Sequence, residues 1–164
     1  MTLSSKIPTK ILFICMGNIC RSPSAEAVMQ ALVKQKGLES KISCDSAGTI
    51  DYHRGKPADA RMQKHARLRG YELSSISRPF ENEDFESFDL IITMDDDNYL
   101  QIKWFDQRKS YTDKIRRMTD FCSTSQISEV PDPYYGGNQG FENVLDILED
   151  ACQGLLEFVM TKKQ

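Results

Sequence analysis

The segment 10–36 constrains the fold of this chain more than any other. After Lys10, residues 11–14 form an apolar run of Ile, Leu and Phe that leads to Cys15, and the segment 10–15 is typical of a buried parallel strand. A short loop leads to Ser22, which is followed by proline, a pattern typical of a helix start with Ser22 as the N-cap. Apolar residues then recur on one helical face until Gly37 ends the helix. A strand that passes through a short loop into a helix is the first unit of a parallel α/β sheet.

The later segments repeat this alternation. The apolar patterns predict three more strands and two more helices, followed by a long amphipathic helix along 141–159. The strands are expected at 41–46, 88–94 and 114–118, and the helices at 59–69 and 95–104. We therefore predict an α/β fold: a four-stranded parallel sheet with helices on both faces, in a single domain 1–164. Residues 1–8 are predicted to be a flexible N-terminal extension.

Composition excludes several classes of protein. The 164 residues are 40% hydrophobic and 27% charged, as in a globular domain, and the net charge of −3 does not favour a nucleic-acid or membrane partner. The chain has no long apolar run and no signal-peptide stretch at its start, so we expect a cytoplasmic protein. An odd number of cysteines without C-x-x-C spacing argues against a disulfide framework and a zinc site. We expect no metal and no cofactor. The cysteines are Cys15, Cys20, Cys44, Cys122 and Cys152.

The loop after the first strand carries the groups of a covalent phosphate enzyme. Cys15 and Arg21 are separated by five residues, with Gly17 and Asn18 between them. Gly and Asn tolerate the left-handed backbone that turns loop N–H groups toward one point, and the following helix N-terminus adds positive potential there. That potential favours a thiolate at Cys15, while Arg21 can bind two oxygens of one phosphate group. We predict a nucleophilic cysteine in an anion-binding loop.

Three motifs together resemble the low-molecular-weight protein tyrosine phosphatases. The signature C-x5-R-S spans 15–22, the segment 45–49 reads Asp-Ser-Ala-Gly-Thr, and the segment 130–136 reads Val-Pro-Asp-Pro-Tyr-Tyr-Gly. They occur in the order and at the spacing of that family, so the resemblance covers nearly the whole chain. It implies hydrolysis of phosphotyrosine or small aryl phosphate monoesters through a cysteinyl-phosphate, with no metal. The implied partners are a phosphotyrosine-containing protein or an aryl phosphate, and inorganic phosphate as product, for a monomer or weak dimer.

The resemblance also implies roles for individual residues. Asp132, held between two prolines, would protonate the departing phenol and then activate water. Ser22 would hydrogen-bond the Cys15 sulfur, although helix capping explains it equally well from sequence alone. Cys20 would form a reversible disulfide with Cys15 under peroxide. The expected substrate-binding residues are Met16, Gly17, Asn18, Ile19, Cys20, Ser22, Tyr52, His53, Tyr134 and Tyr135.

The support of the loop departs from a common family pattern. The resemblance implies that Asn18 is fixed by neighbouring loops, with Ser46 as one partner. Many family members have a histidine where this chain has Ser75. How the loop is supported is therefore left open, and His65, on a different predicted helix, is expected to be a surface residue.

Other functions remain as alternatives. An arsenate reductase of the same fold would need further cysteines to relay a disulfide, and a non-catalytic phosphopeptide-binding module would not need the full catalytic set. The acidic run Asp95–Asp97 could belong to an aspartate-nucleophile phosphatase, but capping of a helix start explains it better. The sequence contains neither a Walker P-loop nor a dinucleotide-binding motif. The acidic run 81–86 is predicted to be a solvated face.

Overall fold

The computed structural model describes residues 8–161 and contains a sheet of four parallel strands. The strands are β1 (Thr9–Cys15), β2 (Ile42–Gly48), β3 (Leu90–Thr93) and β4 (Ile115–Arg117), in the spatial order β2-β1-β3-β4. Cys15 pairs with Gly48 across β1 and β2, and Ile14 pairs with Thr93 across β1 and β3. The predicted parallel sheet is confirmed. Apart from residue 8, the expected N-terminal extension lies outside the described residues.

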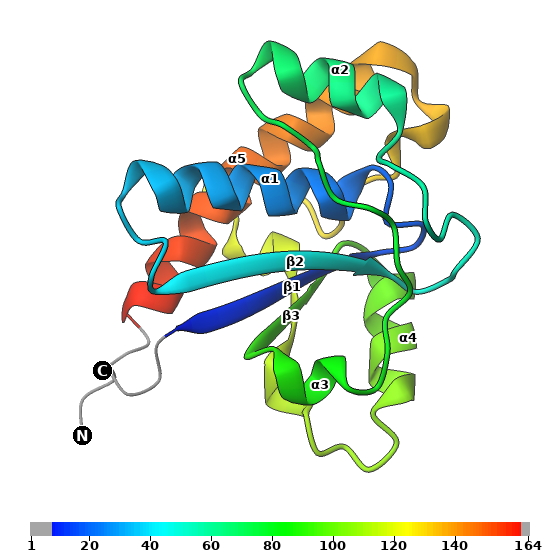
Figure 1. Cartoon of the computed structure of the whole chain (residues 1–164), viewed down its shortest axis with the longest axis vertical. Helices are drawn as coiled ribbons and strands as arrows, with labels where there is room; N and C mark the ends of the chain where they lie inside the picture. Colours follow the sequence, from blue (N-terminus) through cyan, green and yellow to red (C-terminus); the bar gives the residue numbers. More distant parts are fainter. Residues whose placement is uncertain (1–7, 162–164) are drawn as a thin grey trace.

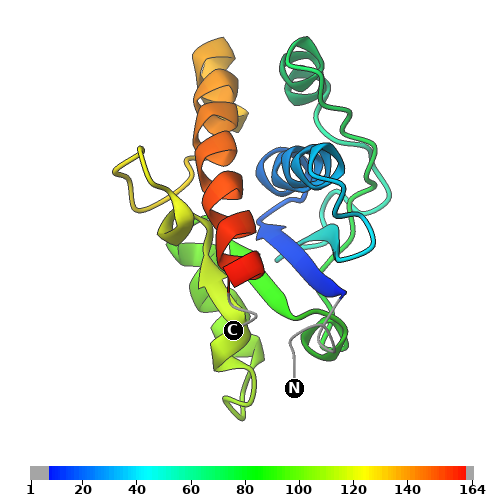
Figure 2. The same ribbon diagram turned by 90° about the vertical axis from the view of Figure 1, so that its left-hand side faces the viewer.

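Helices cover both faces of the sheet, as predicted (Figure 1). The helices α1 (Arg21–Gln35) and α5 (Gly137–Thr161) lie on one side, with α2 (Ala60–Leu68) beyond them. The short α3 (Asp84–Ser87) and α4 (Asp96–Phe105) lie on the other side. Turned by 90°, the same layers appear with α5 running the length of one side (Figure 2). No helix in the part of the chain that the structure describes is long and apolar enough to cross a membrane.

The central strand β1 is buried on both faces. Ile11 and Phe13 face the larger apolar cluster formed with α1 and α5, whereas Leu12 and Ile14 face a smaller one formed with α3 and α4. Alternate residues of a strand point to opposite faces, so a strand between two helix layers must be apolar throughout. This accounts for the unbroken apolar run that precedes Cys15.

The prediction of Ser22 as the cap of α1 is wrong, and the prediction of a solvated acidic face holds for Glu81, Glu83 and Glu86 but fails at Asp84. Helix α1 begins at Arg21 with Cys20 in the N-cap position and no side-chain cap, so Ser22 lies inside the first turn. In the run 81–86, Asp84 is buried because its carboxylate accepts from the Glu81 N–H at 2.8 Å and pairs with Arg78 at 3.0 Å. The charges of Asp84 and Arg78 compensate each other, which permits burial.

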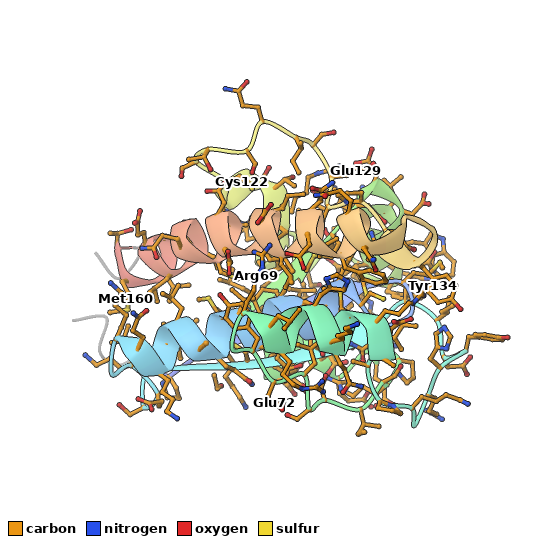
Figure 3. The ribbon with its side chains drawn as sticks, turned by 90° about the horizontal axis from the view of Figure 1, so that it is seen from above. Arg69, Glu72, Cys122, Glu129, Tyr134 and Met160 are labelled. Atoms are coloured by element: carbon orange, nitrogen blue, oxygen red, sulfur yellow. The ribbon has the colours of Figure 1, made fainter. Side chains whose placement is uncertain are left out.

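His65 is also not a plain surface residue. Its imidazole stacks on Phe141 with ring centroids 5.3 Å apart, and its Nδ1 pairs with Glu142. Arg69, at the other end of α2, binds Glu142 and Glu149 on the facing side of α5. Figure 3 shows Arg69 between the two helices. Helix α2 is therefore fixed to α5 by side chains from its middle and its C-terminal end.

Candidate active site

The cysteine loop (residues 15–21) leaves β1 at the carboxyl end of the sheet, where parallel α/β folds place their ligands. Its start is fixed by backbone hydrogen bonds: Thr49 N–H donates to the Cys15 carbonyl at 3.0 Å and Ile50 N–H to the Met16 carbonyl at 3.2 Å. Asn18 has φ of 56°, in the left-handed region. The predicted left-handed turn is thus made by Asn18, whose short polar side chain can hydrogen-bond locally.

Cys15 is the last residue of β1, and its sulfur lies beside the first turn of α1. Its side chain is buried, with 2% of the residue exposed, and Ser22 contacts its sulfur twice. The Ser22 N–H donates to Sγ at 3.4 Å, and the Ser22 hydroxyl lies 3.1 Å from Sγ. Because the helix begins at Arg21, Ser22 is not the N-cap, and its backbone N–H and its hydroxyl both contact the Cys15 sulfur. The positive end of the α1 dipole lies beside this sulfur.

Asn18 joins the cysteine loop to two neighbouring segments. Its amide nitrogen donates to the hydroxyls of Ser22 at 2.8 Å and Ser46 at 3.0 Å. Its amide oxygen accepts from the backbone N–H of Arg78 at 3.0 Å. Asn18 is buried and has partners for both ends of its amide, as a buried polar group requires. Ser46 is thus in contact with Asn18, as the resemblance implied.

A half-buried glutamate continues this network, in a chain that has Ser75 where many family members have a histidine. Ser46 Oγ donates to Glu26 Oε1 at 2.6 Å. Burial raises the pKa of Glu26 above its ordinary value, and the hydrogen bond from Ser46 opposes that rise. The Glu26 carboxylate thus holds the Ser46 hydroxyl, which in turn holds the Asn18 amide.

Arg21 is buried with acidic partners around it. Its Nη1 donates to Asp95 Oδ2 at 2.6 Å and to the Val130 carbonyl at 3.1 Å. Its Nη2 lies 3.7 Å from Asp132 Oδ2. Burial acts to lower the pKa of Arg21, but the negative charges of Cys15, Asp95 and Asp132 outweigh it and raise that pKa. The guanidinium thus stays charged in a site that also contains the candidate nucleophile and the candidate acid.

Asp132 reaches this site on a second loop (the Asp132 loop, residues 129–135). The Val130 N–H donates to the Met94 carbonyl at 2.8 Å, so the loop is anchored beside the end of β3. Asp132 then caps a short 3-10 helix by accepting from the Tyr134 N–H at 3.0 Å. Its side chain is 39% exposed, which leaves a carboxyl open to substrate and water.

The predicted rim residues differ in how exposed they are. Met16, Tyr52 and Tyr134 are exposed, with Tyr52 79% accessible. The ring of His53 lies against Gly17, where an added Cβ would stand 2.9 Å from His53 Cδ2. The absence of a side chain at Gly17 thus makes room for the ring of His53, while the left-handed turn of the loop belongs to Asn18.

The remaining residues predicted to bind substrate are Ile19, Cys20 and Tyr135. Ile19 is half-buried and its carbonyl accepts from the Asp59 N–H at 2.8 Å, which ties the cysteine loop to α2. Cys20 is buried, and burial raises the pKa of its thiol. The side chain of Tyr135 lies outside the described part of the structure.

Sequence reasoning missed Asp95 as a partner of Arg21. The prediction that this acidic run caps α4 is confirmed, since Asp95 accepts from the Asn98 N–H at 2.8 Å. The other oxygen of the same carboxylate binds Arg21. The position of Asp95 directly after β3, the neighbour of β1, was the signal: carboxyl ends of adjacent parallel strands meet at one edge. Among residues 8–161, no group of three or more His, Cys, Asp or Glu is placed to hold a metal ion.

Comparison with known proteins decides the family. A family model described as low molecular weight phosphotyrosine protein phosphatase matches residues 10–164. The chain belongs to this family. A Synechocystis member of the low molecular weight protein-tyrosine-phosphatases is 51% identical over 147 residues, which is 90% of this chain and 94% of that one.

Solved structures agree with this low molecular weight phosphatase in fold. The Entamoeba histolytica protein tyrosine phosphatase has a TM-score of 0.91 and 51% identity, over 95% of this chain and 99% of that chain. A Drosophila arginine phosphatase has a TM-score of 0.85 and 30% identity, over 91% of this chain and 96% of that chain. The phosphatase fold is thus shared by enzymes named for different phosphorylated side chains.

Proposed function

We propose that this low molecular weight phosphatase hydrolyses phosphotyrosine and small aryl phosphate monoesters through a cysteinyl-phosphate. The observation that carries the proposal is the position of Arg21, whose cation lies between Asp132, at 3.7 Å, and the loop that holds Cys15. A nucleophile, an anion-binding cation and an exposed carboxyl around one point are the groups needed for stepwise phosphoryl transfer.

In the first step, the Cys15 thiolate attacks phosphorus opposite the phenolic oxygen. The S–P bond forms as the P–O bond to the phenol breaks, and protonated Asp132 gives its proton to the departing oxygen. Arg21 uses Nη1 for its bonds to Asp95 and Val130. Its Nε and Nη2 remain to bind two phosphoryl oxygens. The positive charge that the phosphoryl group needs thus comes from Arg21 and the loop N–H groups, and no step passes through a metal.

In the second step, the Asp132 carboxylate takes a proton from water, and that water attacks the phosphorus of the cysteinyl-phosphate. The S–P bond breaks, inorganic phosphate leaves, and Cys15 departs as a thiolate. The Ser22 hydroxyl, 3.1 Å from Sγ, can donate to the sulfur as negative charge returns to it. A stabilised thiolate is the better leaving group, so Ser22 assists this step most.

The rim supports an aromatic substrate. The exposed rings of Tyr52 and Tyr134 can flank a phenyl group, and Ile19 in the loop adds an apolar contact. The Drosophila arginine phosphatase shares the fold, so phosphoarginine is the alternative substrate. A competition experiment between phosphotyrosine and phosphoarginine would distinguish the two. We propose phosphotyrosine because stacking against exposed rings favours an aryl ester.

Hydrolysis of p-nitrophenyl phosphate in EDTA under reducing conditions tests the proposal. We expect an active wild type, no activity in Cys15→Ser, and a loss of about a hundred-fold or more in Asp132→Ala. The matched control is Asp113→Ala, since Asp113 is exposed and lies before β4. Rapid quenching of wild type should trap phosphate on Cys15. An active Cys15→Ser variant, or an inactive wild type, would refute the proposed chemistry.

A further inference from the structure

Helix α2 is joined to the cysteine loop at its first residues. The Asp59 N–H donates to the Ile19 carbonyl at 2.8 Å, inside the loop that holds the nucleophile. The Asp59 carboxylate caps α2 by accepting from the backbone N–H groups of Arg61 at 2.8 Å and Met62 at 3.3 Å. Any side chain fixed to Asp59 is therefore fixed relative to the cysteine loop.

Arg61 is such a side chain. Its Nε donates to Asp59 Oδ1 at 3.2 Å and its Nη2 to Asp59 Oδ2 at 2.9 Å, a two-point contact that sets the plane of the guanidinium. The centre of that guanidinium lies 5.1 Å from the ring centroid of Tyr134 and 5.1 Å from that of Phe141. Both distances are within the range of cation–π attraction.

Tyr134 belongs to the Asp132 loop and is hydrogen-bonded to the candidate acid. Its backbone N–H donates to Asp132 Oδ1 at 3.0 Å. A continuous series of contacts thus runs from the Ile19 carbonyl through Asp59, Arg61 and Tyr134 to the carboxyl of Asp132. In Figure 3, Tyr134 lies at the end of the molecule where α5 begins, away from Met160.

We propose that Arg61 is a positioning residue that couples the cysteine loop to the Asp132 loop. It holds the ring of Tyr134 and, through the Tyr134 N–H, sets the direction of the Asp132 carboxyl relative to the sulfur. The inference rests on the proposed general-acid role of Asp132. Arg61 is placed to act on the reaction without contact with the reacting atoms.

The position of α2 has supports apart from Arg61. Arg69 binds Glu142 at 2.6 Å and Glu149 at 3.0 Å on α5, and His65 also pairs with Glu142. The Asp59 cap is made by backbone N–H groups that any residue at position 61 retains. Replacing the Arg61 side chain should therefore loosen Tyr134 and Asp132 while α2 stays in place.

The test compares two substrates that differ in their need for an acid. Phenyl phosphate has a poor leaving group that needs a proton, whereas 2,4-dinitrophenyl phosphate has a good one that does not. We expect Arg61→Met to lower kcat/KM for phenyl phosphate about five-fold and to leave that for dinitrophenyl phosphate within about two-fold. Arg61→Lys, which keeps the cation without the planar fork, should recover part of the loss. Arg67→Met on the same helix is the control, because Arg67 is exposed and pairs with Glu72 at 3.8 Å.

A second variant separates failure of this inference from failure of the proposed function. If Arg61 acts through Asp132, then Arg61→Met in an Asp132→Ala background should cause no further loss with phenyl phosphate. Equal losses on both substrates, or additive losses in the double variant, would overturn the inference. If Asp132→Ala itself affects both substrates equally, the general-acid assignment is the part that fails. Thermal unfolding of each variant identifies global destabilisation, and a Tm of Arg61→Lys far below that of wild type would also count against a positioning role.

Discussion

Asp95 and Arg21 form an ion pair of 2.6 Å at the carboxyl end of the sheet. The arginine proposed to bind substrate thus has a carboxylate partner in the ligand-free protein. The same aspartate caps α4, so one residue orders both a helix and the cation. Because Arg21 is buried, removing the Asp95 charge would leave much of its own charge uncompensated.

We therefore predict that bound phosphate partly compensates the Arg21 charge when the charge of Asp95 is removed. Asparagine is also a good N-cap, so the amide oxygen of Asp95→Asn can keep the bond to the Asn98 N–H, while its NH2 group faces Arg21 and cannot accept from it. The variant therefore loses both the negative charge and the hydrogen bond to Arg21. The variant should lose about 3 kcal/mol of unfolding free energy in phosphate-free buffer. Saturating phosphate should stabilise it by more than it stabilises wild type. Denaturant titrations with and without phosphate measure both, with Asp97→Asn as an exposed control on α4; equal phosphate effects would contradict the prediction.

Glu129 is predicted to fix the start of the Asp132 loop. Its Oε2 accepts from the Asp96 N–H at 2.7 Å, in the first turn of α4, where an unpaired N–H and the helix dipole favour a carboxylate. Glu129→Ala should remove a hydrogen bond that contributes about 1 kcal/mol to holding the Asp132 loop. If that energy is lost from the transition state, kcat/KM for phenyl phosphate falls about five-fold. Glu129→Gln, which keeps an acceptor, should lose less, and Glu39→Ala on the exposed α1–β2 connection is the control. Equal activity of Glu129→Ala and wild type would show that the loop needs no such anchor.

Cys20 is predicted to protect Cys15 from irreversible oxidation. Both thiols are buried in the same loop. Peroxide converts the Cys15 thiolate to a sulfenic acid, and the Cys20 sulfur then displaces water to form the Cys15–Cys20 disulfide, which a dithiol reduces. Wild-type activity should return after peroxide and dithiothreitol, whereas Cys20→Ser should stay inactive. Cys44→Ser is the control, and full recovery of Cys20→Ser would exclude the role.

Asp150 is predicted to make stability depend on acid pH. Burial acts to raise the pKa of its carboxyl, but hydrogen bonds from Ser123, Thr124 and Ser125 outweigh it and hold that pKa below the ordinary value of 3.8. A carboxyl whose pKa is lowered by folding contributes stability above its unfolded pKa, and the contribution is lost as pH falls below it. Asp150→Asn should be about 1–3 kcal/mol less stable than wild type at pH 7, with the gap closing below about pH 4. Unfolding free energies at pH 7, 5 and 3 check this, and a gap that widens in acid would refute it.

Gly154 is predicted to be essential for the contact of α5 with residues 118–121. A Cβ added there would stand 1.9 Å from the Phe121 carbonyl oxygen, so the helix or the backbone of Phe121 would have to move. Overpacking of this kind costs about 3 kcal/mol, against about 1 kcal/mol returned by the helix propensity of alanine. Gly154→Ala should therefore lose about 2 kcal/mol. Gly140→Ala, on the same helix with its nearest contact at 3.6 Å, should lose none, and denaturant unfolding compares the two.

The sequence predicted those parts of the site that depend on neighbouring residues. Cys15, Asn18 and Arg21 belong to one strand–loop–helix unit, and local chain geometry places them together. For Ser22, the capping pattern was wrong, whereas the resemblance to the family had implied the contact of its hydroxyl with the Cys15 sulfur that the structure contains. The helix begins two residues earlier than the capping pattern suggested, and a shift of two residues turns a side chain by about 200°.

The partners of Arg21 were decided by the tertiary structure alone. Asp95 is 74 positions away along the chain and Val130 is 109 away, and they meet Arg21 only because β1 and β3 pair and α5 packs over α1. The same holds for Arg61 and Tyr134, whose contact requires α2 to pack on α5. The sequence by itself determined the parallel sheet and its reactive loop, because periodicity and turn chemistry act over a few residues. The tertiary structure decided which charges face that loop, because such contacts depend on how distant elements pack.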